Sequence, residues 1–121
     1  MNLSRLASLA LVLLLGLARP LIAQVAHGTV SEGLVIESKT LGKPVRYTIY
    51  LPPDYVDSHR FYPVVYLLHG YSDNDMGWLQ FGEANRLVDE GIANGSIPPM
   101  ILLMPDGGVS FYVNNYDGTV R

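Results

Sequence analysis

Two unbroken runs of apolar residues, each followed by a glycine-containing turn, constrain the fold of this chain most strongly. Residues 64–68 (VVYLL) lead into His69 and Gly70, and residues 100–104 (MILLM) lead into the sequence PDGG. Short apolar runs without alternation, bounded by glycine and proline, are typical of strands buried on both faces of a parallel sheet. If a helix connects them, they predict a strand–helix–strand unit with a right-handed crossover.

The segment between the two runs has the spacing of an amphipathic helix. Glu83 lies near its start, where a negative charge is favourable to the helix dipole, and Asn94 and Gly95 supply a stop signal. The apolar residues that recur at helical spacing are Phe81, Ala84, Leu87, Val88 and Ile92.

The residues before the first run predict an antiparallel hairpin. Residues 30–38 and 45–51 alternate in polarity and are joined by the turn LGKP at residues 41–44. In the second of these strands Val45, Tyr47, Ile49 and Leu51 face one way, while Arg46, Thr48 and Tyr50 face the other. We expect a hairpin at a sheet edge with one face wetter than the other. The expected fold class is therefore α/β, an incomplete sheet in which strand 100–104 leaves an open edge.

The first 23 residues have the composition of a secretory signal peptide. Arg5 precedes an apolar run over residues 6–18, and Arg19-Pro20 ends that run before the length of about 20 residues needed to span a membrane. We expect cleavage near Ala23 and a secreted or periplasmic protein without a stable membrane anchor. The absence of cysteine excludes a lipid anchor on that residue. The alternative is a small membrane-anchored protein that retains this segment.

The charge and the histidine spacing exclude several classes of partner and cofactor. The formal net charge is −3, and it becomes more negative when Arg5 and Arg19 leave with the signal peptide. This balance argues against nucleic acid or an anionic membrane as a partner. His27, His59 and His69 lack metal-site spacing, and there is no phosphate loop or dinucleotide fingerprint. We therefore expect no metal and no cofactor.

Five motifs in order resemble an esterase family of α/β-hydrolases. That family holds feruloyl and acetylxylan esterases, S-formylglutathione hydrolases, enterochelin esterases and mycobacterial mycolyltransferases. The resemblance covers about residues 30–115 and implies a serine carboxylesterase. Together with the signal peptide it suggests an exported enzyme that acts on carbohydrate-linked or similar esters, with a small-molecule or polysaccharide ester as substrate. The motifs are LPPDY at residues 51–55, YPVVYLLHG at 62–70, Trp78, IPPM at 97–100 and MPDG at 104–107.

The resemblance also implies which residues of this chain form part of an active site. The backbone N–H of Tyr71 corresponds to one of two donors of an oxyanion hole, and Gly70 would let the backbone approach the substrate closely. His69 is expected to line a substrate pocket rather than act as a base, because the family's catalytic histidine comes late in the chain. Trp78 either walls the same pocket or packs under the loop. Asp106 either stabilises its own turn or borders the pocket.

The chain contains no complete catalytic triad in the order expected of this fold. That order is a serine in a Gly-x-Ser-x-Gly elbow, then an acid, then a histidine. Ser72 and Ser110 both lack the second glycine, and both follow the last histidine, His69. We therefore expect the nucleophile, acid and histidine beyond Arg121. Residues 24–121 would form the N-terminal part of an esterase domain, truncated before the elbow and inactive alone.

A second interpretation of the same residues is a non-catalytic exported domain that kept this part of the fold for binding carbohydrate. The tyrosines and Trp78 would then stack on sugar rings.

Overall fold

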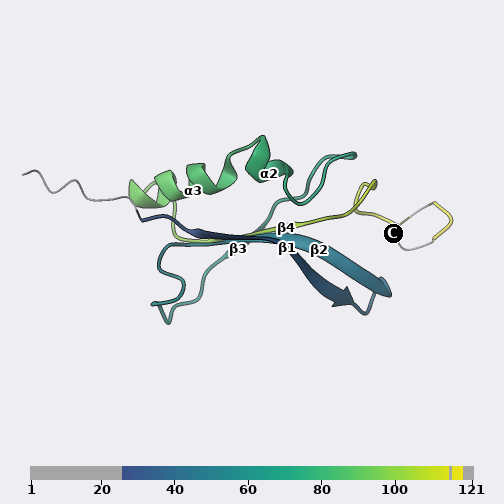
Figure 1. Cartoon of the computed structure of the whole chain (residues 1–121), viewed down its shortest axis with the longest axis horizontal. Helices are drawn as coiled ribbons and strands as arrows, with labels where there is room; N and C mark the ends of the chain where they lie inside the picture. Colours follow the sequence, from purple (N-terminus) through teal and green to yellow (C-terminus); the bar gives the residue numbers. More distant parts are fainter. Residues whose placement is uncertain (1–25, 115, 119–121) are drawn as a thin grey trace, which may run out of the picture.

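The computed structural model describes residues 26–114 and 116–118, which form one mixed sheet with two helices on one of its faces (Figure 1). The sheet order is β1-β2-β4-β3, with β1–β2 and β2–β4 antiparallel and β3–β4 parallel. The predicted hairpin followed by a strand–helix–strand crossover is therefore confirmed. The elements are β1 (Thr29–Ser38), β2 (Lys43–Leu51), β3 (Val64–Tyr66), α2 (Gly77–Gln80), α3 (Ala84–Ala93) and β4 (Ile101–Pro105).

The expectation that the second apolar run forms the open edge is wrong. After α3 the chain returns between β2 and β3, so that β4 is paired on both sides. Leu102 is the register partner of Tyr50 on β2 and of Val65 on β3. β4 is therefore a central strand. The open edge falls on β3 instead, where Val64 and Tyr66 are exposed.

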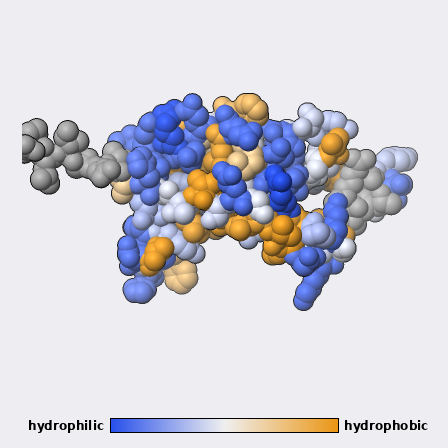
Figure 2. Space-filling view, viewed as in Figure 1, coloured by the Kyte–Doolittle hydropathy of each residue, from blue (hydrophilic) through white to orange (hydrophobic). Residues whose placement is uncertain are grey.

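The core lies between the sheet and the helices. Its buried apolar residues are Tyr50, Ala84, Leu102 and Met104. On β2 the fully buried side chains are Thr48 and Tyr50, both 0% exposed, whereas Val45 and Tyr47 on the other face are only partly buried. Figure 2 shows apolar surface along the middle of the molecule, at the level of the sheet. The face of β2 with more polar atoms thus packs under the helices, because acidic side chains there accept hydrogen bonds from its hydroxyl groups.

The predicted helix is divided into two pieces. Phe81 lies just after α2 and is 81% exposed, so it does not belong to the buried face. Glu83 separates α2 from α3 with a left-handed backbone at φ 47°. α3 then packs Ala84 and Val88 against the core and ends before Asn94 and Gly95, as the sequence predicts.

None of the helices formed by residues 26–114 and 116–118 has the length and apolarity needed to cross a membrane. The predicted signal peptide, residues 1–23, lies outside the described residues and stays a prediction.

Candidate active site at the carboxyl ends of β3 and β4

The loops that follow β3 and β4 lie at the same end of the sheet, because the two strands are parallel neighbours (Figure 1). Ligands of α/β sheets bind at this end of the strands. The first loop begins with the predicted His69-Gly70-Tyr71 sequence, and the second begins with Asp106 and Gly107. The fold therefore brings together two glycine-containing turns that are far apart in the sequence, with His69 and Gly107 separated by 38 positions.

His69 joins these two loops through both nitrogens of its ring. The side chain is 1% exposed. Its Nε2 lies 3.0 Å from the backbone nitrogen of Gly107 and its Nδ1 lies 2.6 Å from the backbone oxygen of Gly70. Because the Gly107 N–H can only donate, Nε2 is the acceptor, and Nδ1–H donates to Gly70. His69 is therefore held as one neutral tautomer with both nitrogens engaged.

Tyr112 completes the connection from the second loop, and no sequence motif pointed to this residue. Its hydroxyl accepts a hydrogen bond from the His69 N–H at 3.1 Å and lies 3.3 Å from the Pro105 carbonyl oxygen, to which it donates. Its ring meets the His69 ring edge-on, with centroids 5.2 Å apart. Burial raises the pKa of Tyr112, so the hydroxyl stays protonated and able to donate.

Tyr71 follows Gly70 in the first of these loops. Within the described residues its N–H donates to no other group. Apart from Gly70 and its two chain neighbours, no residue has an atom within 4 Å of the place where a side chain on Gly70 would begin, so the space beside this peptide is open. The Tyr71 side chain is half exposed and its ring lies against that of Phe111, with centroids 4.9 Å apart.

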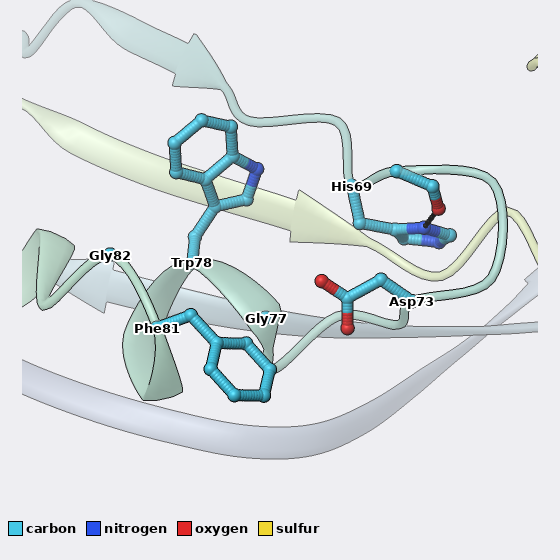
Figure 3. A pocket seen from close by; sticks show the side chains of 7 residues that line it. His69, Asp73, Gly77, Trp78, Phe81 and Gly82 are labelled. Carbon is cyan, nitrogen blue, oxygen red and sulfur yellow. Dashed lines mark hydrogen bonds between the residues drawn. The ribbon is translucent and has the colours of Figure 1, made fainter.

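A cavity of about 310 Å³ lies beside the first loop (Figure 3). Trp78 forms one wall, and its indole N–H donates to the Leu68 carbonyl at 3.0 Å. Trp78 thus both packs against the end of β3 and forms a wall of this cavity. The lining residues are His69, Gly70, Asp73, Gly77, Trp78, Phe81 and Gly82.

Asp106 does not line this cavity. Its Oδ1 accepts a hydrogen bond from the Gly108 N–H at 2.8 Å, the turn-stabilising role that was the first of its two expected functions. It lies 3.6 Å from the Nε2 of His69, beyond the distance of a hydrogen bond, and borders a separate hollow between the β1–β2 turn and the second loop. Of the three predicted pocket residues, the structure brings together His69 and Trp78.

A buried ion pair fixes the far end of the first loop to β2. Asp75 is fully buried, and its Oδ1 accepts from the Nε and one terminal nitrogen of Arg46 at 2.9 and 2.6 Å. Its Oδ2 accepts from the Thr48 hydroxyl at 2.7 Å. Burial alone would raise the pKa of Asp75, but the hydrogen bonds from Arg46 and Thr48 outweigh it and hold that pKa below its usual value. The loop that carries Tyr71 is therefore anchored at both His69 and Asp75.

The comparison with known proteins agrees with this geometry. The family model described as Putative esterase matches residues 38–121, more than half of the chain. The chain belongs to this family. The resemblance drawn from the five sequence motifs is thereby confirmed, together with the α/β-hydrolase fold class.

The relatives of this esterase-family chain are much longer than it is. An endo-1,4-beta-xylanase/feruloyl esterase of Xylanibacter ruminicola is 34% identical over 85 residues, which cover 67% of this chain and 12% of that protein. A solved ferulic acid esterase is 28% identical with a TM-score of 0.65, covering 72% of this chain and 33% of its own. A ferulic acid esterase of Anaeromyces mucronatus, solved with ferulic acid, is 26% identical with a TM-score of 0.61, covering 69% and 30%.

Neither serine of the two loops is paired with a histidine in the described part of this esterase-family chain. The Ser110 hydroxyl donates to the Gly107 carbonyl at 2.8 Å, and the ring nitrogens of His69 are taken by Gly70 and Gly107. Among residues 26–114 and 116–118, no group of histidine, cysteine and acidic side chains could hold a metal ion. The described site therefore offers hydrogen-bond donors and a cavity, without a nucleophile–base pair.

Proposed function

We propose that the protein is a carboxylic ester hydrolase of the serine type and that the described residues form the oxyanion side of its active site. The observation that carries this proposal is the unpaired Tyr71 N–H, held at the carboxyl end of a parallel strand beside a cavity, in a chain of the esterase family. The serine, acid and histidine would come from sequence beyond Arg121. The 121-residue chain alone would then have no turnover.

The chemistry gives the Tyr71 N–H a defined role. When a serine attacks an ester carbonyl, negative charge develops on the carbonyl oxygen, and a fixed N–H aimed at that oxygen stabilises the transition state. Gly70 leaves the space open for the oxygen to approach, and His69 holds the loop that carries the donor. Water then hydrolyses the acyl-enzyme, and no cofactor takes part.

The names of the relatives and the predicted signal peptide together suggest the substrate. One relative is named an endo-1,4-beta-xylanase/feruloyl esterase, and a solved relative is a complex with ferulic acid. We extend this to an exported enzyme that cleaves carbohydrate-linked esters. N-terminal sequencing of secreted protein should begin near Gln24, and recovery of the intact leader from a membrane fraction would contradict export.

The sharpest test replaces the amide of Tyr71 by an ester, using the matching α-hydroxy acid, in the chain extended to the end of its reading frame. This change removes the N–H and leaves the side chain in place. Methyl ferulate hydrolysis should lose about 100–1,000-fold in kcat, the range found for loss of one oxyanion donor. The matched control is the same backbone change at Ser72, and Tyr71→Phe tests the phenol. Equal activity of the two backbone esters would refute the role of Tyr71.

The proposed inactivity of the 121-residue chain has its own test. With methyl ferulate and 4-nitrophenyl acetate, the purified chain should match the rate of its Ser72→Ala and Ser110→Ala variants. Turnover that is lost in one of those variants would show a nucleophile within this chain.

A non-catalytic carbohydrate-binding domain is the second candidate, and one observation favours it. The rings of Tyr71 and Phe111 are 51% and 75% exposed and lie against each other, which offers a surface for a sugar ring. Under this alternative the isolated chain would bind xylan, and Phe111→Ala would abolish that binding. An extended chain that hydrolyses esters would exclude it.

A further inference from the structure

The cavity beside the first loop contains a carboxylate that the proposed oxyanion chemistry does not use. Asp73 points into the space between His69, Trp78 and Phe81 (Figure 3). Its Oδ1 accepts a hydrogen bond from the Asn74 N–H at 2.9 Å. Within the part of the chain that the structure describes, the carboxylate forms no ion pair, and its Oδ2 accepts no hydrogen bond. One oxygen is therefore free to accept a hydrogen bond from a ligand.

The local backbone is built to leave this carboxylate in the cavity. A Cβ on residue 77 would come within 2.0 Å of Asp73 Oδ2, so any side chain other than that of glycine would displace it. Gly77 is itself buried at the start of α2. The position of the Asp73 carboxylate thus depends on a glycine that the sequence spacing alone did not single out.

The other lining groups determine what can meet this oxygen. Trp78 and Phe81 supply aromatic walls, and the Trp78 N–H is already bonded to Leu68. Both ring nitrogens of His69 are engaged by Gly70 and Gly107. Asp73 is therefore the uncommitted polar side chain of an otherwise apolar cavity of about 310 Å³, a size suited to one ring of a ligand.

We propose that Asp73 is a specificity-determining residue that accepts a hydrogen bond from a hydroxyl group on an aromatic ring of the ester substrate. This inference rests on the proposed esterase function and specifies the substrate of the same site. A carboxylate accepts from a hydroxyl donor but repels an anion, so the cavity selects a neutral hydroxylated ring and disfavours a ring bearing a carboxylate. The aromatic walls can stack against an aromatic ring of the substrate.

Binding to the 121-residue chain tests this without any turnover. Trp78 is the single tryptophan, so 5-fluorotryptophan labelling gives one fluorine NMR signal from the cavity wall. The signal should differ between native and urea-unfolded chain, and methyl ferulate should shift it in a saturable way. The 4-O-methyl analogue, which lacks the hydroxyl donor, should bind about tenfold more weakly, as expected for a partly exposed hydrogen bond to a charged acceptor.

The Asp73→Asn variant separates this role from simple packing, because its side-chain oxygen can still accept the Asn74 N–H. It should bring the affinities for methyl ferulate and its 4-O-methyl analogue to within about twofold of each other. Asp57→Asn, an exposed acid in the loop before β3, is the matched control and should keep the tenfold difference.

Three outcomes would overturn the assignment. The first is a fluorine signal that neither ester shifts. The second is a preference for the hydroxylated ester that survives in Asp73→Asn. The third is binding of methyl β-xyloside that depends equally on Asp73, which would assign the carboxylate to a sugar. The proposed function fails separately, if the extended chain hydrolyses no ester.

Discussion

Two buried carboxylates accept hydrogen bonds from hydroxyl groups on the same face of β2, yet they hold different parts of the molecule. Asp75 accepts from Thr48 at 2.7 Å, and Asp89 accepts from Tyr50 at 2.6 Å. Asp75 lies in the loop of the candidate site and also binds Arg46. Asp89 lies within α3 and accepts from the Gly28 N–H at 2.8 Å, outside that site. One carboxylate thus anchors the oxyanion loop, and the other anchors the segment that leads into β1.

The difference between them is the arginine that pairs with Asp75. A buried charge needs a partner of opposite sign or several hydrogen bonds to offset its lost hydration. Asp75 has both, through the guanidinium of Arg46 and the hydroxyl of Thr48. Asp89 accepts from the Tyr50 hydroxyl and the Gly28 N–H, and its Oδ2 lies 3.2 Å from Nδ1 of the exposed His27, which is charged only when protonated. Burial, followed by the hydrogen bond to Asp89, raises the pKa of the Tyr50 phenol. We therefore expect Asp75 to contribute more to stability than Asp89. Replacing Asp75 should also alter the surroundings of the candidate site.

The largest expected effect is that of Asp75→Ala. The change leaves Arg46 without its partner and the buried Thr48 hydroxyl without its acceptor. It should lower the free energy of unfolding by about 3 kcal/mol, the low end for a broken buried pair, because the Arg46 side chain is half exposed and can return to water. Urea unfolding measures this. A loss below about 1 kcal/mol would place the pair among ordinary surface ion pairs.

The matched change at the other carboxylate, Asp89→Ala, should cost less. It removes the acceptor of the buried Tyr50 hydroxyl and of the Gly28 N–H, a loss of about 2 kcal/mol for unsatisfied buried donors. Trp78 follows Asp75 closely in the chain, so its fluorescence in the folded state should change in Asp75→Ala and stay unchanged in Asp89→Ala. If both variants alter that fluorescence equally, the two anchors are not independent.

Acid should reproduce the first of these changes without a mutation. The pKa of Asp75 is lowered in the folded protein, so its stabilising contribution is present above its unfolded value of about 3.9 and is lost as the pH falls through the lower folded value. The difference in unfolding free energy between wild type and Asp75→Asn should therefore be constant near neutrality and shrink below about pH 4. A difference that widens in acid would reverse the sign of this pKa shift.

The parts of the fold that the sequence could predict are local. The unbroken apolar runs predicted β3 and β4, and Gly95 predicted the end of α3, because these signals lie within a few residues of their effect. The insertion of β4 between β2 and β3 depends on pairing across the whole chain, so the edge was assigned to the wrong strand.

The site was predictable to the same extent. The turn after β3 identified His69 and Gly70, but a local pattern could not show which distant groups meet them. Gly107 binds His69 from 38 positions away, and Asp75 binds Thr48 across 27 positions. The position of Asp73 in the cavity depends likewise on a three-dimensional contact with Gly77. Alternation along β2 did not identify its buried face, because buried acids satisfy the hydroxyls there.

The smallest effects should come from the two strand hydroxyls, and they sharpen the comparison most. Thr48→Val and Tyr50→Phe each remove one hydrogen bond to a carboxylate that keeps other donors, so each should cost about 1 kcal/mol. Because Thr48 supports the carboxylate of the site loop, Thr48→Val should also change the fluorescence of Trp78, whereas Tyr50→Phe should leave it unchanged. Double variants with Asp75→Ala and Asp89→Ala measure the coupling, which should appear within each pair and vanish between pairs. Coupling between Thr48 and Asp89 would mean that the core under β2 responds as one unit, and the separate anchoring of the oxyanion loop would then be wrong.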